Sequence, residues 1–161
     1  MAEIATVAAP TRQLSGKTAL MGLAGGVHWG VAMTPMELRE RLADFAAAVA
    51  RYAKPLFRRA ETLNTASQLT RAASSAMANH RSAGRARSHA EFTSKLNVAV
   101  EEIDECQGWL KYLEQSGDVS AEAFEEHSRL YAEATELTAI LTASLNTARR
   151  REKAERTRLR R

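Results

Sequence analysis

The sequence has few of the residues that interrupt helices or cross-link a chain. Only eight of its 161 residues are glycine and three are proline, whereas alanine, leucine, glutamate and arginine are abundant. This composition favours an all-helical protein, and a hydrophobic content of 45% over this length suffices for one domain with a core. The single cysteine, Cys106, permits no intrachain disulfide, so we expect a cytoplasmic location. No apolar run approaches the roughly 18 residues of a membrane span.

Motifs that carry catalysis or bind metal ions are also missing. The sequence contains no glycine-rich phosphate loop, no nucleophile elbow and no zinc-type cysteine cluster. Carboxylates gather between Glu101 and Glu105, but no glutamate has a histidine three residues later, as di-iron helical bundles require. Cys106 lies on an apolar stripe, where we expect a buried, inert thiol. We therefore expect no enzymatic activity, no cofactor and no metal ion.

Positive charge is concentrated at the C-terminal end. The whole chain has a net charge of +4, but residues 149–161 hold eight basic and two acidic residues, a net charge of +6. Residues 1–148 are therefore weakly acidic, with a net charge of −2. A basic tail can bind nucleic acid, because neutralising phosphates releases counterions. The alternative is that the tail is only a solvated helix end that keeps the protein in solution.

The first 33 residues are not part of the predicted fold. They show no helical period, and the glycines of the stretch AGGVHWGVAM argue against a stable helix. We interpret residues 1–33 as a flexible leader, or as the result of a start codon assigned too early, with Met33 or Met36 as the true start. The folded domain is then expected over residues 34–148, followed by a basic C-terminal tail over residues 149–161.

Two amphipathic segments in the first half of the domain are predicted helices. The first begins at the capping box TPME, with Thr34 as the cap and proline at the first helical position. It should end or kink near Lys54, because the next residue is a proline. The second begins at a capping box formed by Thr65 and Gln68 and ends at Gly84, a natural C-cap.

Two further helices are predicted in the second half. The third begins at a capping box formed by Ser88 and Glu91 and ends at Gly117, and the fourth is capped by Ser120. In each helix apolar residues recur at alternating steps of four and three, which places them on one face. With short connections, this pattern predicts an all-α, antiparallel up-and-down four-helix bundle. The expected stripes comprise Leu38, Leu42, Phe45, Val49, Tyr52 and Leu56; Ala66, Leu69, Ala73, Ala76 and Ala83; Phe92, Leu96, Ala99, Ile103, Cys106, Leu110 and Leu113; and Ala123, His127, Leu130, Ala134, Leu137, Leu141 and Ala148, widened by Phe124, Tyr131, Ile140 and Leu145.

An arginine-rich corner joins the second and third predicted helices. Three arginines lie within seven residues, namely Arg81, Arg85 and Arg87. In one interpretation they only cap the end of the second helix, where the helix dipole favours cations, and pair with carboxylates such as Glu91, Glu102 or Glu105. In the other, they form a basic ridge that contacts phosphates or an acidic partner.

The third and fourth helices have more apolar surface than a lone bundle needs. Trp109 and Tyr112 lie away from the main stripe of the third helix, and the fourth helix is apolar over more than one stripe. Such a surplus indicates a contact between subunits, and a head-to-tail contact would close into a ring. The alternative is a wide core within one subunit.

The run from Ser67 to Gly117 resembles the four-helix bundle proteins known as 23S ribosomal RNA intervening-sequence proteins. It is most similar to a branch with the pattern Ala-Asn-x-Arg-x-x-x-Arg-Ala-Arg-Ser-x-x-Glu-Phe, and the EEIDE and WL that follow also match. Weaker similarity extends from about Thr34 to Arg149. The residues that match the pattern are Ala78, Asn79, Arg81, Arg85, Ala86, Arg87, Ser88, Glu91 and Phe92.

The resemblance implies an up-and-down bundle that can assemble into a pentameric ring, and it implies no catalytic role. Related accessory proteins of diversity-generating retroelements are basic, bind nucleic acid and dock onto a reverse transcriptase. RNA or DNA and a reverse transcriptase are therefore the partners that the resemblance implies.

The sequence as a whole predicts a non-enzymatic, homo-oligomeric bundle with weak, backbone-directed affinity for nucleic acid. No sequence-specific readout is expected, because no aromatic platform accompanies the tail. The alternative is a protein-interaction scaffold with no nucleic-acid ligand, whose arginines serve only ion pairs. In the first interpretation the contacts come from Arg81, Arg85 and Arg87 at the corner and from Arg149, Arg150 and Arg151 in the tail.

Overall fold

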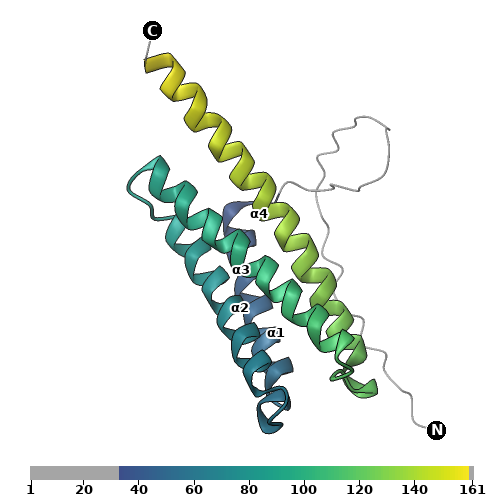
Figure 1. Cartoon of the computed structure of the whole chain (residues 1–161). Coiled ribbons are helices and arrows are strands. Elements are labelled where there is room, and N and C mark those ends of the chain that lie inside the picture. Colours follow the sequence, from purple (N-terminus) through teal and green to yellow (C-terminus); the bar gives the residue numbers. More distant parts are fainter. Residues whose placement is uncertain (1–32, 160–161) are drawn as a thin grey trace, which may run out of the picture. The chain divides into compact units, whose positions relative to one another are not determined.

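The computed structural model describes residues 33–159, and these residues are mainly helical (Figure 1). The predicted leader lies outside the described residues, apart from Met33. The elements in chain order are α1 (Pro35–Ala53), the short 3₁₀ helix η1 (Leu56–Arg58), α2 (Leu63–Ala83), α3 (His89–Gln115), the 3₁₀ helix η2 (Ala121–Ala123) and α4 (Phe124–Leu159).

The four α-helices pack as an antiparallel bundle. Each helix contacts the next one along the chain, and α4 closes the bundle against α1. The contact between α2 and α3 is the most extensive of these, because the α2 face is made mainly of alanine, which lets the two backbones come close. The predicted all-α four-helix bundle is confirmed.

The predicted start and end of α1 are confirmed by its hydrogen bonds. The Thr34 hydroxyl accepts a bond from the Glu37 N–H at 3.2 Å, and the Thr34 N–H donates to the Glu37 carboxylate at 2.7 Å. These two bonds complete a capping box. The helix ends at Ala53, two residues before Pro55, although Lys54 keeps helical dihedral angles and its N–H donates to the Arg51 carbonyl at 3.3 Å.

The predicted cap of α2 at Thr65 is wrong. The helix begins earlier, at Leu63, and Thr65 is a buried residue of its first turn. Thr62 precedes the helix, and its hydroxyl donates to the Leu56 carbonyl at 2.7 Å, which fastens η1 to the start of α2. A Thr-x-x-Gln pattern thus occurs inside a helix here, because the threonine side chain points into the core. The predicted C-cap at Gly84 is confirmed.

The boundaries of α3 and α4 agree with the predicted caps, with one difference. Ser88 accepts the Glu91 N–H at 3.1 Å, but the Glu91 carboxylate binds the N–H of Arg87 at 3.0 Å instead of that of Ser88. The Glu91 carboxylate therefore binds the N–H of the residue before the N-cap, and the reciprocal bond of a capping box is not formed. Gly117 has a φ of 77° and ends α3, and Ser120 caps η2, from which α4 continues.

The predicted apolar stripes form one continuous core. Most of their residues are buried, and Phe92, Ala123, Tyr131 and Ile140 are partly buried and pack against the core. Phe124 is an exception, because it begins α4 at one end of the bundle and is 55% exposed.

Polar contacts join α1 to α4 across the last side of the bundle. The Tyr52 hydroxyl and His127 Nδ1 share a hydrogen bond of 2.9 Å. Burial raises the pKa of Tyr52 to about 12 and lowers the pKa of His127, so both side chains are neutral near pH 7. Nearer the other end of this seam, Arg41 binds Glu133 at 2.6 Å and also pairs with Glu136. These contacts fix the register of α4 against α1.

Candidate nucleic-acid interface

The two predicted groups of arginines lie at the same end of the bundle. The corner between Gly84 and Ser88 joins α2 to α3, and the first residue of α3, His89, donates from Nε2 to the Ala148 carbonyl of α4 at 2.8 Å. The segment 149–151 follows directly. We call this surface the arginine end, defined as Arg81, Arg85, Arg87, Arg149, Arg150 and Arg151.

The predicted tail continues α4 without a break. The helix runs past Ala148 to Leu159, and it extends beyond the α2–α3 corner in Figure 1. Ala148 is the last buried residue among the α4 side chains that the structure describes. Between residues 149 and 158 every side chain is exposed except that of Glu152, which is partly buried. The described part of the basic segment is therefore a solvent-exposed helix that begins where the core ends.

The corner arginines differ in their pairing. Arg87 lies 3.3 Å from the Glu91 carboxylate, so the predicted pair with Glu91 is confirmed, yet its side chain is 89% exposed. Hydrogen bonds from the Arg87 backbone and side chain lower the pKa of Glu91. Arg81 and Arg85 are exposed and form no ion pair with any residue that the structure describes. Both guanidinium groups are therefore free to bind an external anion.

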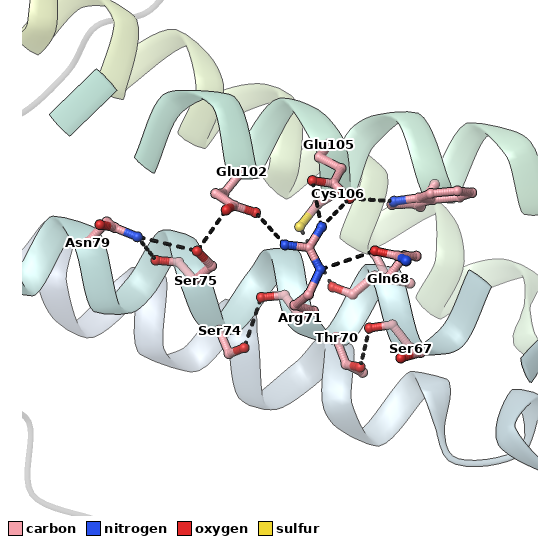
Figure 2. Close-up of polar contacts among 12 residues, drawn as sticks. Ser67, Gln68, Thr70, Arg71, Ser74, Ser75, Asn79, Glu102, Glu105 and Cys106 are labelled. Carbon is pink, nitrogen blue, oxygen red and sulfur yellow. Dashed lines mark hydrogen bonds and ion pairs between the residues drawn. The ribbon is translucent and has the colours of Figure 1, made fainter. Parts of the chain in front are cut away.

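The predicted pairing of the corner arginines with Glu102 and Glu105 is wrong. Figure 2 shows that both carboxylates face Arg71 of α2, which lies 2.8 Å from Glu105 and 3.9 Å from Glu102. Ser75 also donates to Glu102 at 2.8 Å, and the Trp109 indole N–H donates to Glu105 at 2.9 Å. Glu102 and Glu105 thus share Arg71 in the middle of the bundle and form no ion pair with the corner arginines.

Sequence reasoning missed Arg71, although a signal was available. Arg71 lies two residues after the core position Leu69, and Glu105 directly precedes the core position Cys106. Residues that flank core positions on neighbouring antiparallel helices meet at the edge of the contact. The Cys106 thiol hydrogen-bonds weakly to the Leu69 carbonyl, which places these two core positions opposite each other.

A fourth basic residue, Arg39 of α1, lies beside the corner and was also missed. A Cβ atom added at Gly84 would lie 3.1 Å from the Arg39 guanidinium group. His80 lies near it, and burial together with the positive charge of Arg39 lowers the pKa of this histidine. The charge at this end of the bundle therefore comes from α1 as well as from α2 and α4.

The arginines of α4 have different surroundings. Arg149 donates to the Asn97 side-chain oxygen of α3 at 2.8 Å, Arg150 is exposed, and Arg151 lines a groove next to α3. Exposed guanidinium groups without a carboxylate partner bind phosphate with two parallel hydrogen bonds. The arginine end is therefore suited to a polyanion.

Other kinds of site have less support in the described part of the chain. Within residues 33–159 no three His, Cys, Asp or Glu side chains are grouped so that they could hold a metal ion. None of the helices described is both long and apolar enough to cross a membrane. Cys106 is fully buried, as predicted, and burial raises the pKa of its thiol.

Comparisons with known proteins identify relatives of the bundle. Residues 36–143 match the family model of the 23S rRNA-intervening sequence proteins. A crystal structure of a protein with unknown function from the S23 ribosomal protein family of Bacteroides thetaiotaomicron is similar, with 25% sequence identity and a TM-score of 0.64. That similarity covers 71% of this chain and 99% of the other, whereas no curated protein matches. The chain belongs to the 23S rRNA-intervening sequence protein family.

Proposed function

We propose that this chain is a cytoplasmic, non-enzymatic, homo-oligomeric bundle that binds nucleic acid through the phosphate backbone. The observation that supports this function is the arginine end, where two groups of arginines that are distant in the sequence adjoin. Repulsion between like charges makes such a cluster costly unless an anion covers it. A phosphate backbone supplies that negative charge at regular spacing.

Binding of this kind is weak and depends steeply on salt. Each phosphate that an arginine neutralises releases counterions, and this release becomes less favourable as the salt concentration rises. Contacts to phosphate position the ligand but do not read its sequence. The family-matched region contains the corner arginines, whereas Arg149, Arg150 and Arg151 follow it, so the α4 extension adds to the affinity of this particular chain.

The homo-oligomer is supported by exposed aromatic surface away from the arginine end. Tyr112 near the end of α3 is 51% exposed, and Trp109 packs edge-on against it with ring centroids 6.0 Å apart. Phe124 at the start of α4 is also exposed. Exposed aromatic residues are enriched at the core of subunit interfaces. This surface would leave the arginine end accessible in the assembly.

The test compares two variants of the full chain that lose the same charge at opposite ends of the bundle. Binding of a fluorescently labelled single-stranded RNA is measured by anisotropy at several salt concentrations. The corner variant should bind about tenfold or more weakly, with a salt slope less steep by about 2, and the control variant should bind like the wild type. The corner variant carries Arg81→Gln, Arg85→Gln and Arg87→Gln, and the control variant carries Arg51→Gln, Lys54→Gln and Arg58→Gln.

Light scattering with and without RNA distinguishes this function from that of a scaffold. If the corner variant loses assembly or thermal stability while its RNA affinity is unchanged, the arginines serve only ion pairs and the protein is an interaction scaffold. Equal affinity losses in both variants would instead indicate unlocalised electrostatic attraction and contradict a defined interface.

A further inference from the structure

We propose that the groove between the first turn of α3 and the facing part of α4 binds one unpaired base of a single-stranded nucleic acid. This inference rests on the proposed function and specifies its ligand class. The groove is open and has a volume of about 460 Å³. The side chains that its chemistry depends on are His89 and Phe92 of α3 and Ser144, Thr147 and Arg151 of α4.

Two aromatic rings form one wall of this groove. The rings of His89 and Phe92 lie with centroids 6.2 Å apart and planes tilted by 36°. Phe92 is only partly buried, because it packs against the core on one side and lines the groove on the other. Aromatic side chains of this kind are the platforms on which proteins stack the bases of single strands, since every base has a π-face.

The histidine of this pair is held in one orientation. His89 Nε2 donates to the Ala148 carbonyl at 2.8 Å, so in the neutral ring Nδ1 carries no proton. Nδ1 can then accept a hydrogen bond from an N–H group of the base. The contact with Ala148 also keeps α3 and α4 at a fixed separation, which preserves the groove without a ligand.

The α4 wall adds hydrogen-bond acceptors and a cation. The hydroxyls of Ser144 and Thr147 donate to the backbone of their own helix at 2.9 and 3.0 Å, so each hydroxyl oxygen remains available to the groove only as an acceptor. Arg151 lies one turn further along the same face and is exposed. A base in the groove would therefore meet acceptors at its edge, while Arg151 binds the adjacent phosphate.

This arrangement selects a single strand over a duplex. The bases of a duplex are stacked on each other, and the major groove of double-stranded RNA is too deep and narrow for side chains to enter. An aromatic ring in a groove contacts a base face only if that base is unstacked. The sequence analysis expected no aromatic platform beside the tail, whereas this proposal places one there, at the point where His89 of α3 meets Ala148 of α4.

The test uses the full chain with variants of Phe92. The probes are a single-stranded RNA of about 12 nucleotides that carries 2-aminopurine and a duplex of the same length. The wild type should bind the single strand more tightly and change the 2-aminopurine fluorescence. Phe92→Leu should lose about tenfold in affinity for the single strand, with unchanged salt slope and duplex affinity, because stacking is lost but no charge is removed. Phe92→Tyr should retain binding, since it keeps the ring.

Matched variants separate the groove from general effects on the fold. Thr147→Leu narrows the groove at an exposed position and should weaken single-strand binding without changing thermal stability. Phe57→Leu removes a ring of η1 that is 42% exposed and lies outside the groove, and it should have no effect. If Phe92→Leu and Thr147→Leu bind the single strand like the wild type, or if the wild type prefers the duplex, the groove is not a base site. If the wild type binds neither probe at low salt, the proposed function itself fails.

Discussion

Replacing Ile103 by alanine is expected to lower the free energy of unfolding by about 3 kcal/mol. Ile103 lies in the middle of α3 with 0% of its surface exposed, and the helices that surround it cannot fill the space left by its lost methyl groups. A loss of this size corresponds to a fall in the melting temperature of roughly 10 °C for a domain of this length. Urea and thermal unfolding followed by circular dichroism, at one fixed protein concentration, measure the change.

Asp104→Ala is the matched control for this substitution. Asp104 is the next residue of the same helix and is exposed, so its replacement should change the free energy of unfolding by less than about 0.5 kcal/mol. If both variants unfolded alike, Ile103 would not be a core residue and the assignment of the α3 stripe would be wrong.

A chain that ends at Ala148 is expected to lose at least about 100-fold in nucleic-acid affinity near 0.1 M salt. The removed residues carry a net charge of +6, and each neutralised phosphate of a single strand contributes about 0.7 to the salt slope. The slope should therefore become less steep by up to about 4 units. Because none of the described α4 side chains beyond Ala148 is buried, the thermal stability of the shortened chain should change little.

A chain that ends at Glu152 distinguishes the arginines next to the bundle from the rest of the segment. It keeps Arg149, Arg150 and Arg151, so its affinity should lie between those of the full and the shortest chain. Equal affinities for all three chains, or the absence of a salt slope, would show that the α4 extension does not bind the nucleic acid. Only the α2–α3 corner would then remain as a candidate binding surface.

The helices could be predicted from the sequence because their signals are local. The alternation of four and three residues places Ile103 and Leu110 on one face whatever surrounds the helix, and both are fully buried. The cap of α2 could not be predicted in this way. Thr65 matches a capping pattern, but its side chain is buried in the first turn of α2. The residue that precedes the helix is Thr62, and its hydroxyl donates to the Leu56 carbonyl of η1, which lies outside the helix.

The candidate site was predicted as separate residues but not as a surface. Its six arginines are visible in the sequence, whereas their proximity depends on the corner and the end of the α4 core lying together, which the contact between His89 and Ala148 establishes. Arg71 pairs with the two carboxylates that were expected at the corner, Glu102 and Glu105, and Arg39 adds charge to the corner from α1. These contacts join residues of different helices, such as Arg71 and Glu105, which are 34 positions apart, so periodicity and motif spacing do not reveal them.

Photo-cross-linking locates the nucleic acid on the protein most directly. The full chain is irradiated with a single-stranded RNA that contains 4-thiouridine, and the attached peptides are identified by mass spectrometry. We predict attachment at the α2–α3 corner and along α4 from Ser144 to Arg158, and its loss at high salt. Attachment confined to the α1–α2 end of the bundle, or spread evenly over all four helices, would contradict a binding surface at the arginine end.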